Sequence, residues 1–395
     1  MLSDQLRALA EAYYPEVVDI RHHLHAHPEL SFKEYETATY VAARLNAIGI
    51  TNWKNIAGTG IVALIEGLNP ESRCVALRAD MDALPIQEKN TTDYCSRNEG
   101  IMHACGHDVH TSCLLGAAHI LYQLRHEFEG TVKLLFQPGE EQHPGGASIM
   151  IADGALQDPK PEAIFGLHVY PNLPAGTVGF RPGQYMASAD EIYITIEAKG
   201  GHAALPQQSA DPIAIAALVI TGLQQVISRK CDPLSPSVLT FGKIAGGFAT
   251  NVIPEKVEIL GTFRAMNEQW RFEAHKWIKD FTEQTCASMG ANVTVEIPVG
   301  YPVLFNDHAL TNKAITWAGE LLGKENVNHL DMRMGAEDFS FYTHHVPGCF
   351  FRIGTNKDNK EFTTPVHNSR FEINEDALKT GMEMMAWMAL NALKC

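Results

Sequence analysis

Positive charge is scarce in this chain of 395 residues, which carries 31 Lys and Arg against 46 Asp and Glu. The formal net charge of −15 argues against nucleic acid as a partner and leaves no basic face for a membrane surface. An anionic small molecule is not excluded, because one well-placed arginine can outweigh the mean field of the protein.

Cysteine pairs and long apolar runs are also missing. The 8 cysteines are scattered and form no CxxC motif, which is typical of reduced cytoplasmic thiols rather than of a disulfide framework. No run of apolar residues is long enough to predict a transmembrane helix. Residues 1–4 are polar, and no basic segment followed by an apolar block indicates a secretory signal. We therefore expect a cytoplasmic protein without a membrane partner.

The remaining composition, 45% hydrophobic and 19% charged, is that of a globular protein long enough for two domains. Helices are expected over 3–26 and 34–48. Pro15 is expected to open a second helix at its first turn, and Gly49 to follow the end of the helix over 34–48. Apolar patterns further predict strands at 61–65, 74–77 and 131–136, and helices at 109–124, 308–322 and 375–392.

The pattern changes near residue 186. Between 190 and 198, isoleucines alternate with polar residues, which predicts a half-buried strand. The elements that follow give the order β-α-β-β-α-β of the ferredoxin-like arrangement. We therefore predict an α/β protein in which an α+β domain, 187–299, is inserted into a discontinuous domain, 1–186 and 300–395. The further elements expected in the insert are helices at 209–229 and 267–289 and strands at 237–244, 256–264 and 292–297.

The segment 102–110 has the highest density of reactive side chains: three imidazoles, a thiol and a carboxylate. Cys105 and His107 are two residues apart, so in an extended or looped segment their side chains point to the same side. A thiolate and an imidazole together suit a borderline-soft divalent ion. The alternative is an ordinary histidine-rich helix start with Asp108 in its first turn, and this segment alone does not decide between the two.

Ligand-type residues also occur at other predicted strand ends and loops, where sites of open α/β sheets form. Glu140 and Glu141 are adjacent carboxylates, of which one can bind metal while the other acts as a base. Such a pair more commonly forms a solvated acidic turn. The Gln-Pro-Gly segment that joins this pair to a buried strand makes that alternative less favourable. Asp80 is either a capped turn or the carboxylate that holds a ligand imidazole by its far N–H. The other candidates are Glu140, Glu141, His168 and His367.

Three residues of the predicted insert could contact a substrate. His202 and Asn251 lie in loops, and a lone loop histidine is usually just exposed. Arg264 lies in an apolar strand, where a guanidinium needs a partner. Either an internal salt bridge or the carboxylate of a substrate, held in a bidentate pair, would provide one.

Together these motifs resemble the dinuclear-metal aminoacylase and exopeptidase family. Within it they resemble the amidohydrolase branch of hippurate hydrolases, N-acyl-amino-acid deacylases and auxin-conjugate hydrolases. The match extends over almost the whole chain, and its motifs are jointly very specific. They are Arg21–Leu30, Arg78–Pro85, Met102–Asp108, Gln137–Glu141, Gly166–Val169, Gly201–Ala204 and Met334–Phe339.

The resemblance implies a zinc-exopeptidase-like catalytic domain with a mixed, mostly parallel sheet flanked by helices. The insert would be a lid that also forms a homodimer. The implied activity is hydrolysis of the amide bond of N-acyl amino acids. The branch accepts benzoyl, indole-acetyl, acetyl and longer acyl groups, so the resemblance leaves the acyl group open.

The resemblance also assigns roles to residues. Cys105 would bridge two divalent ions, where other branches use an aspartate, and Glu140 would be the general base that later donates its proton. Asp80 would orient a ligand histidine, and His202 would polarise the scissile carbonyl, often from the neighbouring subunit. The remaining metal ligands would be His107, Glu141, His168 and His367, and the substrate contacts Asn251, Arg264 and Gly335.

Three imidazoles, one thiolate and one carboxylate suit Zn, Mn, Co or Ni better than Mg or Ca. The thiolate also predicts sensitivity to oxidation.

Three other functions stay open. A dipeptidase or aminopeptidase with the same ions needs an acidic group for the free amine of its substrate, and no candidate stands out. A catalytically dead metal-binding scaffold would have lost the base or a ligand, whereas Glu140 and all five candidates are present. Cys105 and His107 could instead form a structural zinc site or a thiol nucleophile, but the glutamate pair and the distant histidines fit neither well. Structural zinc normally closes with four ligands and leaves no base.

Overall fold

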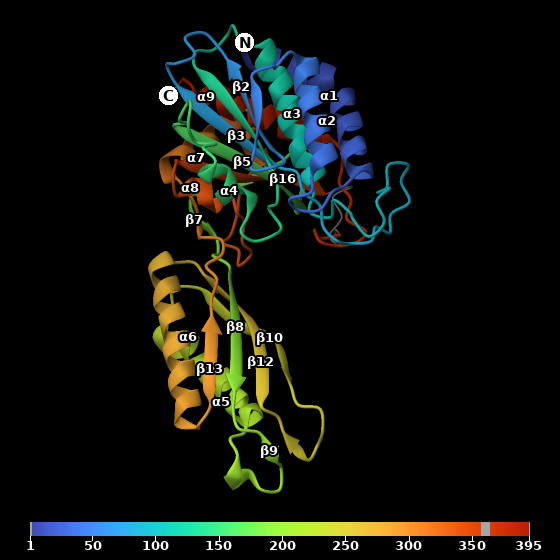
Figure 1. Ribbon diagram of the computed structural model, residues 1–395. Coiled ribbons are helices and arrows are strands. Elements are labelled where there is room, and N and C mark those ends of the chain that lie inside the picture. The colour runs from blue at the N-terminus through green and yellow to red at the C-terminus, as the bar shows by residue number, and fades with distance from the viewer. Residues whose placement is uncertain (1, 357–363, 395) are drawn as a thin grey trace. The chain divides into compact units, whose positions relative to one another are not determined.

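The computed structural model describes residues 2–356 and 364–394. The chain divides into two compact units, which we describe separately (Figure 1). The first unit comprises Met1–Gly183, Phe305–Asp331 and Asp338–Cys395, and the second comprises Gln184–Leu304 and Met332–Glu337.

An eight-stranded sheet in the order β1-β2-β4-β3-β5-β16-β6-β15 forms the centre of the first unit. The pairs β3–β4, β3–β5, β5–β16 and β6–β15 are parallel, whereas β1–β2, β2–β4 and β6–β16 are antiparallel. The mixed, mostly parallel sheet expected from the sequence is therefore confirmed. Its strands are β1 (Trp53–Ile56), β2 (Gly60–Glu66), β3 (Cys74–Asp80), β4 (Thr131–Gln137), β5 (Ala163–Pro174), β6 (Val178–Phe180), β15 (Val327–His329) and β16 (Gly348–Asn356).

Helices surround this sheet. The helix α3 packs against α1, α9 and the strands β3 and β5 (Figure 1). Its residues from His107 to Ala118 are all buried, which places the start of α3 inside the unit. The helices are α1 (Leu2–Ala26), α2 (Tyr35–Ile48), α3 (His107–Gln123), α4 (Gly146–Ala152), α7 (His308–Leu322), α8 (Ser340–Thr343) and α9 (Asp376–Ala392), with a 3₁₀ turn at Lys324–Asn326.

The helix α1 corrects one expectation. We expected Pro15 to open a second helix, but α1 continues through it from Leu2 to Ala26. Proline removes one helical hydrogen bond. Apolar residues on both sides of Pro15, such as Ala10 and Val17, are fully buried, and this burial stabilises one continuous helix. Gly49 does end α2 as expected, with a left-handed φ of 102°.

The second unit contains an antiparallel sheet in the order β10-β12-β8-β13 with two helices, α5 and α6. The chain order β8-α5-β10-β12-α6-β13 is the predicted ferredoxin-like order. The three isoleucines of β8 are all buried in a core of their own. The bounds are β8 (Asp190–Glu197), α5 (Pro212–Gln225), β10 (Ser237–Gly246), β12 (Lys256–Ala265), α6 (Glu268–Ser288) and β13 (Asn292–Glu296).

Several short elements complete the chain. In the second unit β9 (Gly201–His202) pairs with β11 (Val252–Ile253), 3₁₀ residues occur at Pro206–Gln208, and a π-turn, Val226–Lys230, follows α5. The strands β7 (Gly183–Met186) and β14 (Leu304–Asn306) lie where the chain passes between units. The segment Pro212–Lys230 is the one described helical stretch apolar and long enough to cross a membrane. Its Ile215, Val219 and Leu223 are buried in the core of the second unit.

Candidate metal centre

Cys105 is common to two groups of ligand atoms in the first unit. One group is formed with His107 and His168, the other with Glu141 and His367, and within each group all ligand atoms lie within 4.8 Å of one another. Cys105 Sγ is 3.5 Å from His168 Nε2 and 3.3 Å from His367 Nε2. The structure thus brings all five predicted ligands together, with the thiol shared by both groups.

In two histidines a hydrogen bond at Nδ1 leaves Nε2 as the atom available to a metal. His168 Nδ1 donates to the carbonyl of Val169 at 2.8 Å, and His107 Nδ1 donates to Asp82 Oδ1 at 3.1 Å. In a neutral imidazole the other nitrogen, Nε2, then carries a lone pair. The Nε2 atom of His107 is buried and has no hydrogen-bond partner among the described residues. Against the effect of burial, the carboxylates of Asp80 and Asp82 raise the pKa of His107 to about 10. A buried polar atom without a partner is costly, and a divalent ion would take the proton's place there.

The electrostatics of the centre also fit a cation. Burial raises the pKa of the Cys105 thiol well above its usual value, and the carboxylates of Glu141 and Glu140 raise it further. Burial lowers the pKa of His168 and keeps this imidazole neutral. A thiol surrounded by acidic groups ionises only when positive charge is supplied, and metal ligation supplies it. The donor set present therefore fits divalent ions.

Local backbone structure brings these ligands from distant parts of the chain. Cys105 lies in the turn before α3, and His107 is the first residue of that helix. His168 lies in β5, and Glu141 follows β4 by four residues. His367 has a left-handed φ of 64°, unusual for a non-glycine residue. Its N–H donates to the carbonyl of Ala104 at 2.8 Å, which fixes it beside the Cys105 turn.

Glu140 is adjacent to this centre without belonging to either group that shares Cys105. Its carboxylate lies within 4.8 Å of ligand atoms of His107 and Glu141. It is 7% exposed, so the residue is buried but not sealed from solvent. The neighbouring Glu141 Oε1 is 3.2 Å from His367 Nε2 and 3.9 Å from His107 Nε2. The two adjacent glutamates are therefore placed differently, as a division into ligand and base requires.

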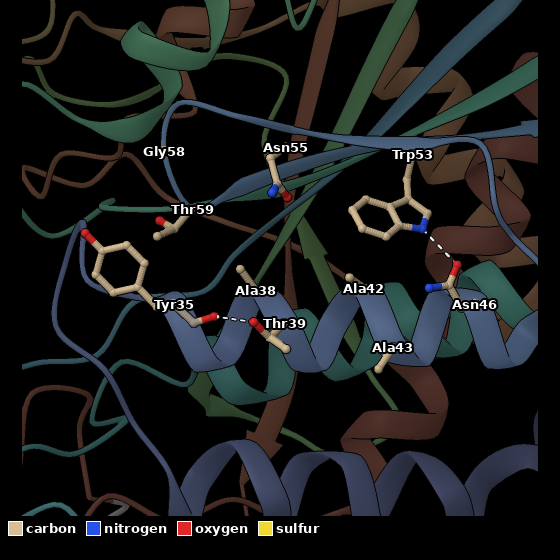
Figure 2. A pocket seen from close by; sticks show the side chains of 10 residues that line it. All are labelled: Tyr35, Ala38, Thr39, Ala42, Ala43, Asn46, Trp53, Asn55, Gly58 and Thr59. Atoms are coloured by element: carbon tan, nitrogen blue, oxygen red, sulfur yellow. Dashed lines mark hydrogen bonds between the residues drawn. The ribbon is translucent and has the colours of Figure 1, made fainter.

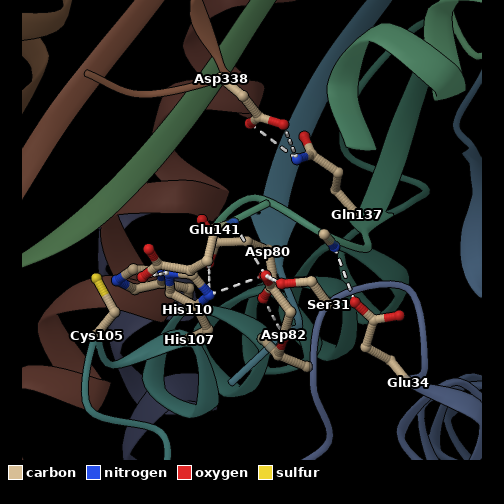
Figure 3. Close-up of polar contacts among 12 residues, drawn as sticks. Ser31, Glu34, Asp80, Asp82, Cys105, His107, His110, Gln137, Glu141 and Asp338 are labelled. Atoms are coloured by element: carbon tan, nitrogen blue, oxygen red, sulfur yellow. Dashed lines mark hydrogen bonds and ion pairs between the residues drawn. The ribbon is translucent and has the colours of Figure 1, made fainter. Parts of the chain in front are cut away.

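The carboxylate nearest to His107 is that of Asp82, not of Asp80 (Figure 3). Asp80 Oδ1 is 3.8 Å from His107 Nδ1 but 2.5 Å from His110 Nδ1. Since the N–H of Val169 donates to His110 Nε2 at 2.9 Å, His110 connects Asp80 to the strand that carries His168. The sequence motif predicted Asp80 for this role and not Asp82, although Asp80 ends β3 and Asp82 follows two residues later.

Asp82 contacts two of the candidate ligands at once. Besides His107, it accepts a hydrogen bond from the backbone N–H of Glu141, at 3.0 Å from Oδ2. Ser31 Oγ donates to the same oxygen at 2.6 Å. Burial opposes the ionisation of Asp82, but the hydrogen bonds from His107 and Ser31 lower its pKa. Asp82 is thus an ionised carboxylate that holds ligands from two separate segments.

Replacing Asp82 by Asn should weaken metal binding by about 10–100-fold, the usual cost of losing a residue that orients a ligand. The amide cannot accept from three donors as the carboxylate does, so His107 or the Glu141 peptide loses its partner. Competition with a chelator measures the affinity. Ser31→Ala removes only one outer hydrogen bond and should weaken binding less. Unchanged affinity in Asp82→Asn would contradict the assignment.

A buried polar network supports Asp80 on its other side (Figure 3). Arg78 donates to Asp80 Oδ2 and to Asp338 Oδ1, each at 2.6 Å. Gln137 Nε2 donates to both oxygens of Asp338, at 2.9 and 2.7 Å. All four residues are fully buried. The network connects the ends of β3 and β4 to the segment before α8 and so fixes the strand ends from which Asp82 and Glu140 follow.

The predicted substrate residues belong to the second unit. His202, in β9, is exposed and accepts from the N–H of Ala204 through Nδ1 at 3.1 Å, so Nε2 carries the proton. It pairs with Val252, which follows the exposed Asn251. Arg264, in β12, donates to Thr262 Oγ1 at 2.6 Å but forms no ion pair with any described residue. The carbonyl of Gly335 accepts from the N–H of Ala187 at 3.1 Å.

Comparison with known proteins is consistent with this centre. A family model described as peptidase family M20/M25/M40 matches residues 76–391. The IAA-amino acid hydrolase ILR1-like 4 of Arabidopsis thaliana is 41% identical over 387 residues, covering 96% of this chain and 86% of that protein. The N-acyl-L-amino acid amidohydrolase of Geobacillus stearothermophilus is 41% identical over 306 residues, covering 78% and 82%.

A solved structure is similar as well. It is a dinuclear metal-binding peptidase of the M20 family from Bacillus subtilis, 34% identical, with a TM-score of 0.84 over 97% of this chain and 99% of that one. The resemblance inferred from the sequence motifs is confirmed, as is the expected class of enzyme, a hydrolase of amide C–N bonds. The chain belongs to peptidase family M20/M25/M40.

Proposed function

We propose that this enzyme cleaves N-acyl amino acids to a carboxylic acid and a free amino acid, with Glu140 as general base. The observation that carries the proposal is the pair of donor groups sharing Cys105, with the Glu140 carboxylate beside them. Two relatives whose names specify amino-acid amide substrates, at 41% identity, support the substrate class. Hydrolysis of hippurate but not of Gly-Gly, after addition of Mn or Zn, tests it against a dipeptidase.

Cys105, His107, Glu141, His168 and His367 would hold two divalent ions, and Zn, Mn, Co or Ni suit this donor set. When bound, such ions lower the pKa of a water from about 16 toward about 7 and neutralise developing negative charge. Glu140 would accept the proton of the attacking water and return it to the leaving amine. A positioned acid–base group typically contributes about 10²–10⁴-fold to the rate.

The second unit would provide the contacts to the substrate. Because the contact with Ala204 uses only Nδ1 of His202, its Nε2–H could donate to the oxyanion. In other enzymes, removing one such donor costs about 2.7–4 kcal/mol of transition-state stabilisation. The guanidinium of Arg264 lacks an internal carboxylate partner, which favours a substrate carboxylate as its partner. Asn251 and Gly335 would complete the binding of the amino-acid portion.

Arg264→Ala should raise KM for an N-acyl amino acid by about 10–100-fold, the cost of one charge-assisted pair, and much less for the methyl ester of the same compound. The ester has no negative charge, so the guanidinium contributes little to its binding. Initial rates with both substrates measure the difference. An equal rise in KM for the two would eliminate the carboxylate contact.

A homodimer through the second unit accounts for its exposed apolar residues. Ile213 and Leu218 on α5 are 44% and 51% exposed, and Ile244 on the edge strand β10 is 53% exposed. An edge strand with apolar side chains is a ready surface for pairing with a second copy. Sedimentation should show a mass near twice 43.5 kDa, and Leu218→Glu should shift it to the monomer. A monomeric wild type would refute the dimer.

The described cysteines support a reducing, cytoplasmic location. All seven of them are free thiols in the structure. Their lack of pairing fits a compartment in which glutathione and thioredoxin keep thiols reduced.

A further inference from the structure

Glu34 occupies the position of a capping residue but does not cap its helix. It is the N-cap residue of α2, and its side chain makes no capping hydrogen bond. Glu29 does this instead, since its carboxylate accepts from the N–H of Glu36 at 3.2 Å and of Thr37 at 2.8 Å. The Glu34 carboxylate is therefore available for another role.

That carboxylate is fully buried and faces the turn that carries Glu140. Oε1 of Glu34 accepts from the N–H of Gly139 at 2.8 Å (Figure 3) and from the N–H of Phe32 at 2.9 Å. Oε2 accepts from Thr59 Oγ1 at 2.7 Å, and Thr59 lines a surface cavity beside α2 (Figure 2). These three donors, two backbone N–H groups and one hydroxyl, are all neutral. A buried carboxylate held by neutral donors alone is costly.

The backbone N–H groups of both neighbours of Glu140 are held by buried carboxylates. The N–H of Gly139 donates to Glu34, and the N–H of Glu141 donates to Asp82. Asp82 in turn accepts from Ser31 Oγ at 2.6 Å. Both carboxylates thus depend on the segment 31–34, so this segment fixes the turn before and after Glu140.

Side-chain packing confirms how closely this segment and the turn approach. A Cβ atom added at Gly139 would lie 2.4 Å from the ring of Phe32, so only glycine fits there. Gly139 has a φ of 59°, and Phe32 has a φ of 63° although it is not glycine. Non-glycine residues in this region are strained, and strain of this kind concentrates at functional sites.

We propose that Glu34 is a positioning residue, which acts through Gly139 to keep the Glu140 carboxylate beside the metal centre. The proposal rests on the proposed function, because it takes Glu140 as the base. A catalytic group displaced by about 1 Å can cost about 10²-fold in rate. Glu34 itself would touch neither substrate nor metal.

Glu34→Ala should lower kcat about 10²-fold while leaving KM and metal content, measured by elemental analysis, near wild type. Glu34→Gln keeps an acceptor for Gly139 and should recover most of that loss. Glu29→Ala is the matched control. It also removes a carboxylate near the start of α2, but one that caps the helix and does not contact Gly139. It should lower the melting temperature and leave kcat within about twofold. An equal loss of kcat in the Glu29 and Glu34 variants would overturn the proposal.

A double-mutant cycle separates positioning from general damage. If Glu34 acts through Glu140, Glu34→Ala should cause no further loss in a Glu140→Gln background. A full additional loss of about 10²-fold would overturn the proposal. Amide hydrogen exchange tests the positioning role of Glu34 separately from the proposed hydrolysis of N-acyl amino acids. Exchange at residues 139–141 should accelerate in Glu34→Ala but not in Glu29→Ala, even if no N-acyl amino acid is hydrolysed. Unchanged exchange there would refute the positioning role on its own.

Discussion

Glu140→Gln should lower kcat for N-acyl amino acids by about 10²–10⁴-fold, the range of general acid–base catalysis, while the protein keeps its metal. The amide has nearly the shape of the carboxylate but cannot accept a proton at neutral pH. Metal should stay bound because Glu140 belongs to neither of the two donor groups that share Cys105. Steady-state kinetics and elemental analysis of the same preparation test both parts.

The adjacent glutamate offers a matched control. Glu141 Oε1 lies 3.2 Å from His367 Nε2, within the second donor group. Glu141→Gln should therefore lose metal, and excess metal should restore part of its activity. The opposite pattern, metal loss in Glu140→Gln and a metal-loaded but inactive Glu141→Gln, would exchange the two roles. Retained activity in Glu140→Gln would remove the base altogether.

Most of the fold could be predicted from the sequence, because the spacing of apolar residues indicates which segments are helices and which are strands. Alternation in β8 and the strand and helix order that follows were sufficient for the ferredoxin-like unit. Pro15 shows where local rules fail. A proline predicts a helix boundary from backbone sterics, but the burial of Ala10 and Val17 depends on tertiary packing that no local pattern reveals.

The candidate site could be predicted only as a set of residue types. Cys105 and His367 are 262 positions apart, and their 3.3 Å approach follows from the fold, so family resemblance was needed to group them. The choice between Asp80 and Asp82 depends on side-chain direction at a strand end, where both residues looked equivalent. Glu34 gave no signal, since a glutamate before a predicted helix is usually exposed to solvent. Its contact with Gly139 spans 105 positions.

Cys105→Ala should have the largest effect on the metal centre, because one side chain is removed from both donor groups. The loss of affinity should exceed the 10–100-fold typical of residues that only orient a ligand. Two ions held close together also repel each other, and a shared anionic ligand offsets part of that repulsion. We therefore expect less than two equivalents of metal after dialysis and no measurable turnover. Cys113→Ala, which removes a buried thiol from α3, the helix that follows Cys105, should change neither quantity.

Cys105→Asp tests the shared role more directly than deletion does. A carboxylate has two oxygens and can bind two ions at once, and the family resemblance implies an aspartate in this role in other branches. The variant should recover two equivalents of metal and part of kcat, whereas Cys105→Ser, a neutral hydroxyl, should not. Cys105→Asp should also resist inactivation by peroxide, because the oxidisable thiolate has been removed. If Cys105→Ala kept two equivalents, the two ions would have to be held without the thiol. The donor groups described above would then not be the metal centre.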